Sequence, residues 1–288
     1  MTNKILSVLG EKNQLIPLIL DSPHSGTFYP DDFNYVTTLE KIRQAEDTFV
    51  NELYMDSIKT GAVLICANFP RSYIDPNRSE VDFDYNFVEN GEALHNVFNF
   101  KPTVKTKLGI GLIWTKVPPD GEQMYNRKLL AEEVKYRVIN YHRPYHEKLT
   151  SVMKKTYKKF GRFYHINCHS MQNNASAMST QKKGTLRPDF VIGDKDGTSC
   201  NKKFTDLVVG FLRTLNYSVD INDPYKGMEL ISAYSNPKIN KNSIQIEVNR
   251  KLYMNEKTRE KTSQFKRLKN DLYKLICELK LQINKGYL

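Results

Sequence analysis

The stretch Ile16-Pro17-Leu18-Ile19-Leu20-Asp21-Ser22-Pro23-His24-Ser25-Gly26 is an apolar run that ends in a polar turn carrying a histidine. The apolar part is typical of a buried β-strand. A side chain directly after such a strand is held on a rigid scaffold yet faces solvent, which is where α/β proteins place ligands and catalytic groups. His24 is therefore a candidate functional residue, although a hydrogen-bonded turn histidine would give the same pattern.

Strand-like and helix-like segments alternate along the rest of the chain. The expected strands cover 16–22, 62–67, 163–168, 189–193, 217–221 and 243–249, and the expected helices cover 42–59, 126–141, 144–160, 199–216 and 256–283. This alternation predicts an α/β fold, a three-layer sandwich around a mixed, mainly parallel sheet. Pro144 is expected to begin a new helix, because proline fits the first helical turn better than the interior.

We expect a single catalytic domain over residues 1–288, because no linker or repeat divides the chain. An irregular insert is expected around 82–121, where Gly and Pro are scattered and no helical or strand period is sustained. Such an insert in an α/β fold often forms a lid or the rim of a pocket.

Composition and charge narrow the classes of function. No run reaches the ~18–20 apolar residues of a membrane helix, and the first six residues lack the apolar core of a signal peptide. We therefore expect a cytoplasmic protein with no membrane partner. The four cysteines, which form no CxxC pair, disfavour a thiolate zinc site and a disulfide scaffold.

The net charge of +11 is concentrated near the C-terminus, where residues 251–288 hold ten Lys or Arg and four Asp or Glu. A basic tail can bind nucleic acid. However, apolar residues recur there at helical spacing, at Phe265, Leu268, Leu272, Leu275 and Leu279. We therefore favour an amphipathic C-terminal helix around 256–284, docked by its apolar stripe with its lysines in solvent, over a nucleic-acid arm. The same stripe could support a homodimer.

A metal site would explain two histidines and an acid together. His24 follows the first strand, and His169 follows the strand expected at 163–168. Zinc in hydrolases takes three His, Asp or Glu ligands, keeps a fourth position for water, and makes that water more acidic. His24 and His169 would supply two ligands, and Asp47 is the best third candidate. Asp47 could instead be an acid that the helix macrodipole favours in an early turn.

Glu247 alternates with isoleucines in the strand expected at 243–249. It either faces solvent on a half-exposed strand, or it is a functional acid whose pKa is raised in a partly dry site. A carboxylate of the second kind can take a proton from water and pass it to a leaving nitrogen.

Two arginines, Arg71 and Arg78, bracket an Asp-Pro turn just after the strand expected at 62–67. The rigid fork of an arginine binds carboxylates bidentately, and the neighbouring Asn77 adds a neutral donor. Two surface arginines beside an ordinary turn would look the same.

These motifs, in their order and approximate spacing, resemble the N-formylglutamate amidohydrolase (deformylase) family. The matching segments run from about residue 17 to residue 256. They are Pro23-His24-Ser25-Gly26 with Tyr29-Pro30, Asp47 with Leu53-Tyr54, Tyr73-Ile74-Asp75-Pro76-Asn77-Arg78, Arg143-Pro144-Tyr145-His146, Cys168-His169-Ser170-Met171, Arg187-Pro188-Asp189, 196–200, Lys226-Gly227, and Gln245-Ile246-Glu247 with Tyr253-Met254.

The resemblance implies zinc-dependent hydrolysis of the amide bond of an N-acyl amino acid, with an N-formyl one such as N-formylglutamate expected. It also implies an exopeptidase-like fold, distantly similar to zinc carboxypeptidases and aspartoacylase. One zinc ion would be held by His24, Asp47 and His169. Those relatives often supply a glutamate three residues after the first histidine, but Thr27 stands there, so the later acid Asp47 is the expected ligand.

The resemblance further implies roles for the other polar residues. Glu247 looks like the general base, and Arg71 like the arginine that stabilises the oxyanion. Asn77 and Arg78 look like the pair that holds a terminal carboxylate. Arg143 could bind a second acidic group of the substrate, or it could tie a helix start to the core.

Asn167 departs from the family pattern, because an aspartate is expected two residues before the ligand histidine. Metal affinity or water basicity could differ as a result. His142 and His146 have the spacing of a helical metal pair, but the acid of HExxH is missing and Pro144 interrupts the turn. We therefore expect them at a pocket rim or in the core.

Two alternatives stay open. The same zinc chemistry could act on a peptide or a cell-wall amide, or an inactive hydrolase scaffold could serve as a nucleic-acid or protein binding module. The acyl group and the side chain of the substrate are expected to depend on the insert around 82–121 and on loops near Tyr225.

Overall fold

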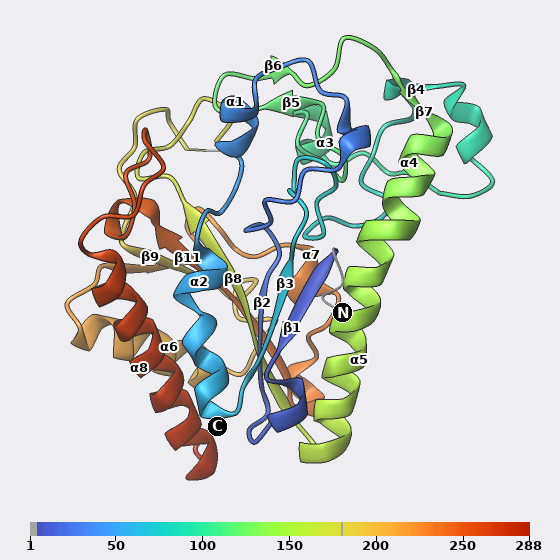
Figure 1. Cartoon of the computed structure of the whole chain (residues 1–288). Helices are drawn as coiled ribbons and strands as arrows, with labels where there is room; N and C mark the ends of the chain where they lie inside the picture. Colours follow the sequence, from blue (N-terminus) through green and yellow to red (C-terminus); the bar gives the residue numbers. More distant parts are fainter. Residues whose placement is uncertain (1–4, 180) are drawn as a thin grey trace.

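The computed structural model describes residues 5–179 and 181–288 and shows a seven-stranded sheet with helices on both faces (Figure 1). The strands, in spatial order, are β1 (Leu6–Leu9), β3 (Val63–Ala67), β2 (Leu18–Ser22), β8 (Phe163–Met171), β11 (Lys241–Asn249), β9 (Phe190–Gly193) and β10 (Val219–Ile221). β3, β2, β8 and β11 are parallel, whereas β1 and β9 pair with their inner neighbours in antiparallel fashion. The predicted α/β fold with a mixed, mostly parallel sheet is confirmed.

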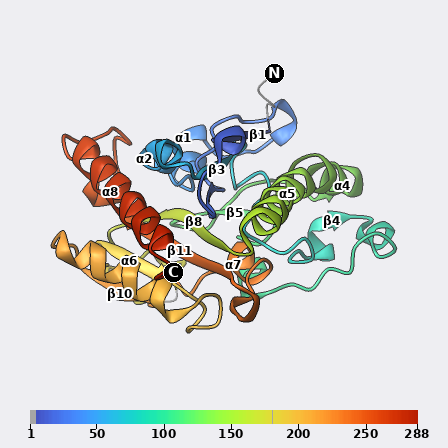
Figure 2. The same ribbon diagram turned by 90° about the horizontal axis from the view of Figure 1, so that it is seen from below.

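The central strands are apolar on both faces because helices cover both of them. The helices are α1 (Leu39–Arg43), α2 (Val50–Leu53), α3 (Val104–Lys107), α4 (Ala131–Arg137), α5 (Arg143–Phe160), α6 (Lys202–Thr214), α7 (Glu229–Ser232) and α8 (Phe265–Asn284). α2, α6 and α8 lie on one face, and α4, α5 and α7 lie on the other (Figure 2). The apolar stripe of α8 is buried against the first face, although the helix begins at Phe265 rather than near residue 256.

The continuous helix predicted over 42–59 is wrong. α1 ends at Arg43 and α2 begins at Val50, and the backbone between them turns through a left-handed residue, Phe49, at φ 65°. The N–H of Asp47 donates to the carbonyl of His24 at 3.0 Å. This turn therefore holds Asp47 against the loop after β2 rather than in a helical turn.

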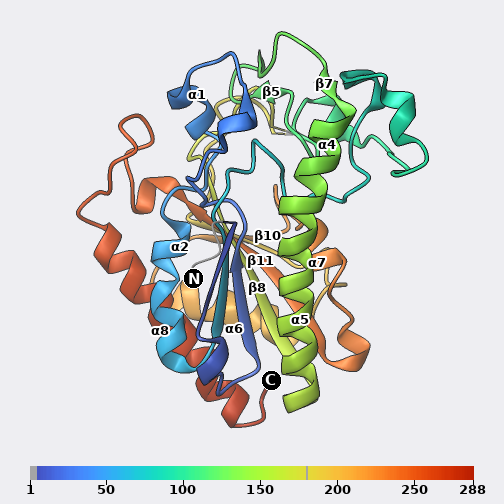
Figure 3. The same cartoon turned by 45° about the vertical axis from the view of Figure 1, so that its right-hand side comes forward.

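The helix break predicted before Pro144 is also wrong. α4 continues through a π-helical turn, Val138–His142, directly into α5, and the ribbon is unbroken in Figure 3. A proline lacks the N–H of a regular helix and clashes with the preceding turn. The wider π turn just before Pro144 accommodates both features.

The insert contains short elements that the sequence did not reveal. They are α3 and two pairs of two-residue strands, β4 (Val88–Glu89) with β7 (Leu129–Leu130) and β5 (Lys116–Val117) with β6 (Glu122–Gln123). Together with α1, these elements gather beyond one end of the sheet (Figure 1). That end is where β2, β3, β8 and β11 reach their carboxyl termini.

None of the helices in the described part of the chain is both long and apolar enough to span a bilayer. Residues 1–4, on which the expectation of no signal peptide partly rests, lie outside the described residues.

Candidate metal centre and active site

His24, Asp47 and His169 come together at the carboxyl edge of the sheet. His24 lies just beyond β2, Asp47 lies in the turn before α2, and His169 lies near the end of β8. Each offers one ligand atom, these atoms all lie within 4.8 Å of one another, and all three residues are buried. The three candidate ligands, far apart in the sequence, thus form one cluster.

The hydrogen bonds of His24 define which of its ring nitrogens is free. Its Nε2 lies 2.7 Å from Oδ1 of the Asp75 carboxylate, so Nε2 carries the proton. Its Nδ1 lies 3.3 Å from Oδ2 of Asp47 and has no hydrogen-bond partner among the described residues. A bare lone pair of His24 therefore faces Asp47.

The same reasoning applies to His169. The amide nitrogen of Asn167 donates to Oδ1 of Asp21 at 2.9 Å, which fixes the orientation of that amide. The Asn167 oxygen then accepts from Nε2 of His169 at 2.6 Å, the shorter of the two contacts of this nitrogen, and the Asn77 amide nitrogen at 3.1 Å makes no hydrogen bond to it in this tautomer. The lone pair on Nδ1 of His169 is left facing Oδ2 of Asp47 at 3.0 Å.

Two nitrogen lone pairs and a carboxylate oxygen that face one another repel unless a cation lies among them. This donor set, two histidines and one carboxylate, is one that catalytic zinc uses, and the outer nitrogens are oriented as in known carboxylate–histidine–metal arrangements. Burial opposes ionisation of Asp47, but its contacts with His169 and His24 and the charge of Arg71 hold its pKa well below the usual range. The residues present fit a divalent metal.

Asp75 connects this cluster to the arginines. Its Oδ2 accepts from Nη2 and Nε of Arg71 at 2.8 and 3.2 Å, and its Oδ1 accepts from His24 and from the N–H of Asn77. Although Asp75 is buried, the charges of Arg71 and Arg78 and the hydrogen bond from His24 hold its pKa well below the usual range. The guanidinium of Arg71 also lies 5.0 Å above the Trp114 ring.

Glu247 lies beside the cluster, because β11 pairs with β8 in a register that sets it opposite His169. Its side chain is buried, which excludes the half-exposed alternative. Burial raises the pKa of Glu247 and the negative charge of Asp47 adds to this, while His169 and the arginines Arg71 and Arg187 oppose it. A raised pKa suits a group that exchanges protons during a reaction.

Asn77 and Arg78 lie next to the cluster. The oxygen of the Asn77 amide accepts from the N–H of Leu230 at 3.1 Å, and its nitrogen lies 3.1 Å from Nε2 of His169. Arg78 is buried and donates to the carbonyl oxygens of Ile110 and Asn77. The nearest carboxylate oxygen recorded for it, from Asp75, is 4.0 Å away.

A hollow of about 500 Å³ opens onto these side chains. Most of the residues predicted for the site line it, namely His24, Asp47, Arg71, Asn77, Arg78, His169 and Glu247. Residues of the insert also contribute, including Lys105, Ile110 and Trp114. The structure thus brings together the predicted ligands, base and arginines of the Arg71–Arg78 turn.

A model of the N-formylglutamate amidohydrolase family matches residues 16–254 of the chain. The chain belongs to this family. It is 26% identical over 245 residues to the N-formylglutamate deformylase of Pseudomonas putida, covering 84% of this chain and 83% of the relative. It is 24% identical over 253 residues to the N-formylglutamate deformylase of Pseudomonas aeruginosa, covering 86% of each. The chain is thus homologous to N-formylglutamate deformylases, which are amidohydrolases.

Solved structures agree with this assignment. The crystal structure of N-formylglutamate amidohydrolase from Ralstonia eutropha JMP134 has a TM-score of 0.91 at 40% identity and covers 99% of this chain and 100% of that one. A protein from Agrobacterium tumefaciens has a TM-score of 0.70 at 14% identity, covering 98% of this chain and 97% of that one, and shares the fold. The predicted family is confirmed.

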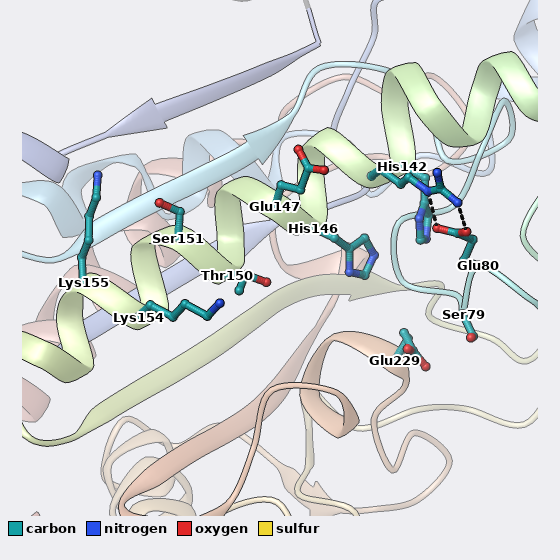
Figure 4. Close-up of a pocket in the computed structure, with 11 residues that line it drawn as sticks. Ser79, Glu80, His142, His146, Glu147, Thr150, Ser151, Lys154, Lys155 and Glu229 are labelled. Carbon is teal, nitrogen blue, oxygen red and sulfur yellow. Dashed lines mark hydrogen bonds and ion pairs between the residues drawn. The ribbon is translucent and has the colours of Figure 1, made fainter.

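In this N-formylglutamate amidohydrolase family member, one residue predicted for the active site, Arg143, lies outside the hollow that holds the metal cluster. Arg143 pairs with Glu80, with Nη2 to Oε1 at 2.6 Å and Nε to Oε2 at 3.0 Å. It lines a second hollow of about 680 Å³ between α5 and α7, shared with His142 and His146 (Figure 4). The structure does not bring Arg143 to the hollow that holds the metal cluster.

His142 and His146 make hydrogen bonds to the backbone on either side of Asn77. Nε2 of His146 lies 2.9 Å from the carbonyl of Pro76, and Nε2 of His142 lies 2.9 Å from the carbonyl of Arg78. A carbonyl can only accept, so both nitrogens donate, one on each side of Asn77. Burial lowers the pKa of His142 to about 4 and that of His146 to about 3, so both rings are neutral.

The sequence reasoning missed several charged residues of this site. Nη2 of Arg250 lies 3.1 Å from Oδ1 of Asp47, opposite the face that meets the histidines. Its position three residues after Glu247, at the end of the same strand, is the signal that could have revealed it. Asp21 is one residue of a buried strand that is otherwise apolar up to Ser22, and Lys105 lies in the insert, where no pattern marks it.

Proposed function

We propose that the protein hydrolyses the amide bond of an N-formyl amino acid such as N-formylglutamate, with one zinc ion held by His24, Asp47 and His169. The observation that carries this proposal is the cluster of three ligand atoms within 4.8 Å of one another, in which Nδ1 of His24 has no hydrogen-bond partner among the described residues, beside the buried Glu247. The names of the homologous deformylases support the choice of substrate.

A zinc ion bound at these ligands would lower the pKa of a water molecule and polarise the formyl carbonyl. Glu247 takes the proton from the attacking water as the carbon–oxygen bond forms. It then delivers that proton to the amide nitrogen as the carbon–nitrogen bond breaks. The products are formate and the free amino acid.

Arg71 is positioned to stabilise the negative charge that develops on the substrate during the reaction. Its Nε and Nη2 are occupied by Asp75, and its guanidinium lies over Trp114. The group is therefore fixed before the reaction begins. Its Nη1, which lies 4.0 Å from Oδ1 of Asp47 and thus next to the metal cluster, stabilises the negative charge that develops on the carbonyl oxygen. Fixed donors of this kind lower the barrier because they need not reorganise during the reaction.

Asn77 and Arg78 bind the α-carboxylate of the substrate. Arg78 is a buried cation whose recorded partners are carbonyl oxygens, with Asp75 4.0 Å away, so its charge is available to an anionic ligand. The neighbouring amide of Asn77 is oriented by Leu230 and lies against a metal ligand. The α-carboxylate is thereby placed close to the scissile bond.

The test is a hydrolysis screen of N-formyl, N-acetyl and N-succinyl amino acids by protein of measured zinc content, with and without added zinc. We expect formate release from N-formyl amino acids and about one zinc per chain, as a three-ligand site predicts. No turnover of any of these by fully loaded protein, with turnover of peptide or cell-wall amides, would select the alternative substrate. A cytoplasmic location and a homodimer remain predictions.

A further inference from the structure

Arg250 contacts the proposed metal ligand Asp47 through the carboxylate oxygen that the histidines do not face. It is the first residue after β11, in a 3₁₀ turn that covers Arg250–Leu252, and its side chain is buried. Its Nη2 donates to Oδ1 of Asp47 at 3.1 Å. Because an arginine keeps its charge in a protein, this contact is a charge-assisted hydrogen bond between two buried groups.

The two oxygens of the Asp47 carboxylate have different neighbours. Oδ2 lies 3.3 Å from Nδ1 of His24 and 3.0 Å from Nδ1 of His169. Oδ1 faces two cations, with Nη2 of Arg250 at 3.1 Å and Nη1 of Arg71 at 4.0 Å. The carboxylate thus presents one oxygen to the metal cluster and the other to guanidinium groups.

The guanidinium of Arg250 is itself held by three acceptors. Besides the contact with Asp47, its Nε donates to Oγ of Ser170 at 3.1 Å, and its Nη1 donates to the carbonyl oxygen of Gln44 at 3.2 Å. Ser170 directly follows the ligand His169 on β8, and Gln44 lies three residues before Asp47. One side chain therefore connects the two segments that carry these ligands.

The backbone of Asp47 is fixed separately, by the loop after β2. Its N–H donates to the carbonyl of His24 at 3.0 Å, and its carbonyl accepts from the hydroxyl of Ser25 at 2.9 Å. The main chain is thus anchored at one end of the residue and Oδ1 is anchored at the other. Outer partners of this kind fix the orientation of a metal ligand.

Binding both oxygens of Asp47 to one metal ion would require Oδ1 to leave Arg250. The guanidinium would then keep a buried donor without an acceptor, which is unfavourable. A carboxylate that binds through one oxygen occupies a single coordination position. Three protein ligands of this kind leave the fourth position of a zinc ion open for water.

We infer that Arg250 is a positioning residue, which restricts Asp47 to one metal bond through Oδ2 and so keeps a coordination position open. The inference rests on the metal site of the proposed function. It goes beyond that proposal because it assigns a separate role to each oxygen of one ligand and names the residue that separates them.

The crystal structure of the zinc-loaded wild type tests the inference directly. We expect Oδ2 of Asp47 at about 2.0–2.2 Å from the zinc ion, with Oδ1 still within hydrogen-bond distance of Nη2 of Arg250. Two Asp47 oxygens at bonding distance from zinc, or a carboxylate that has left Arg250, would overturn the inference. This test uses the unaltered protein and so does not depend on the folding of a variant.

Cobalt(II) in place of zinc tests the role of Arg250 by a spectroscopic signal. The visible absorption of cobalt(II) weakens as its coordination number rises, since geometry governs these bands. Arg250→Met frees Oδ1 of Asp47, so we expect the absorption per bound cobalt to fall by about twofold or more. Arg250→Lys, which keeps a charged donor, should lie closer to wild type.

Arg43→Met is the matched control for the cobalt experiment. Arg43 pairs with Glu46, the residue before Asp47, with Nε and Oε1 3.1 Å apart. This variant removes an arginine from the same turn, and its cobalt spectrum should match that of wild type. An unchanged spectrum in Arg250→Met, or an equal change in Arg43→Met, would overturn the role of Arg250.

Metal content and formate release separate this inference from the proposed function. A zinc-loaded wild type with one Asp47 oxygen on the metal, but with no formate release from N-formyl amino acids, would refute the proposed function and support the role of Arg250. Formate release together with two-oxygen binding would support the function and overturn that role. Failure of wild type to bind zinc or cobalt would overturn both.

Discussion

The amide oxygen of Asn167 lies 2.6 Å from Nε2 of His169, in the place where the family resemblance leads us to expect a carboxylate. The negative charge has not been lost from this part of the structure. It lies one side chain further away on Asp21, which accepts from Asn167 at 2.9 Å and also from His165 and Tyr145. Asp21 therefore fixes the orientation of the Asn167 amide, and this amide in turn fixes the ring of His169, the proposed metal ligand.

Exchanging the acid and the amide tests this relationship. Asn167→Asp should lower stability by about 1–3 kcal/mol, because Asp21 loses a buried donor and gains a second carboxylate beside it. Adding Asp21→Asn should recover part of that loss, since one acid and one amide face each other again. Thermal unfolding of wild type, both single variants and the double variant measures the coupling. Strictly additive effects of the two changes would contradict the proposed pairing.

Glu247→Gln separates metal binding from catalysis. The change keeps the size of the side chain and removes the group proposed to carry the proton. We expect zinc content equal to that of wild type and a loss of kcat by at least about 100-fold, within the usual contribution of a general base. Metal analysis and formate release measure the two quantities on the same samples. Near-normal turnover would refute the assignment of the base.

Arg78→Ala should weaken the binding of substrates that carry a free α-carboxylate. We expect KM for N-formylglutamate to rise by at least about tenfold, while the corresponding α-amide, which lacks that charge, is much less affected. The steady-state constants for the acid and the α-amide provide the comparison. Equal losses for both would show that Arg78 supports the fold of the site rather than the carboxylate.

Removing the metal should destabilise the protein. Without a cation, the lone pairs of His24 and His169 face the carboxylate of Asp47 in a buried cluster. A ligand that binds only the native state stabilises it, so chelation should lower Tm and stoichiometric zinc should restore it. In a variant with Asp47→Asn and His169→Gln, Tm should no longer respond to zinc. An unchanged Tm of wild type after complete metal removal would argue against a metal at these residues.

Much of this protein follows from sequence alone. Apolar runs such as β2 and β8 are buried on both faces, so their composition predicts a parallel sheet covered by helices. The side chains that follow or end these strands, among them His24, His169 and Glu247, share one edge for the same reason. The order of motifs points to the family because each motif is tied to a fixed place in that topology.

The tertiary structure decided what depends on neighbours from distant parts of the chain. Asn167 is explained by Asp21, which lies opposite it only once β2 and β8 pair in register. Arg143, at the start of α5, is directed to Glu80 by packing, and Lys105 is directed to the hollow by the path of the insert, which has no periodicity to reveal it. Local sequence specifies strands and turns, whereas the partner of a charged side chain is set by packing, because electrostatic contacts depend on distance in space rather than along the chain.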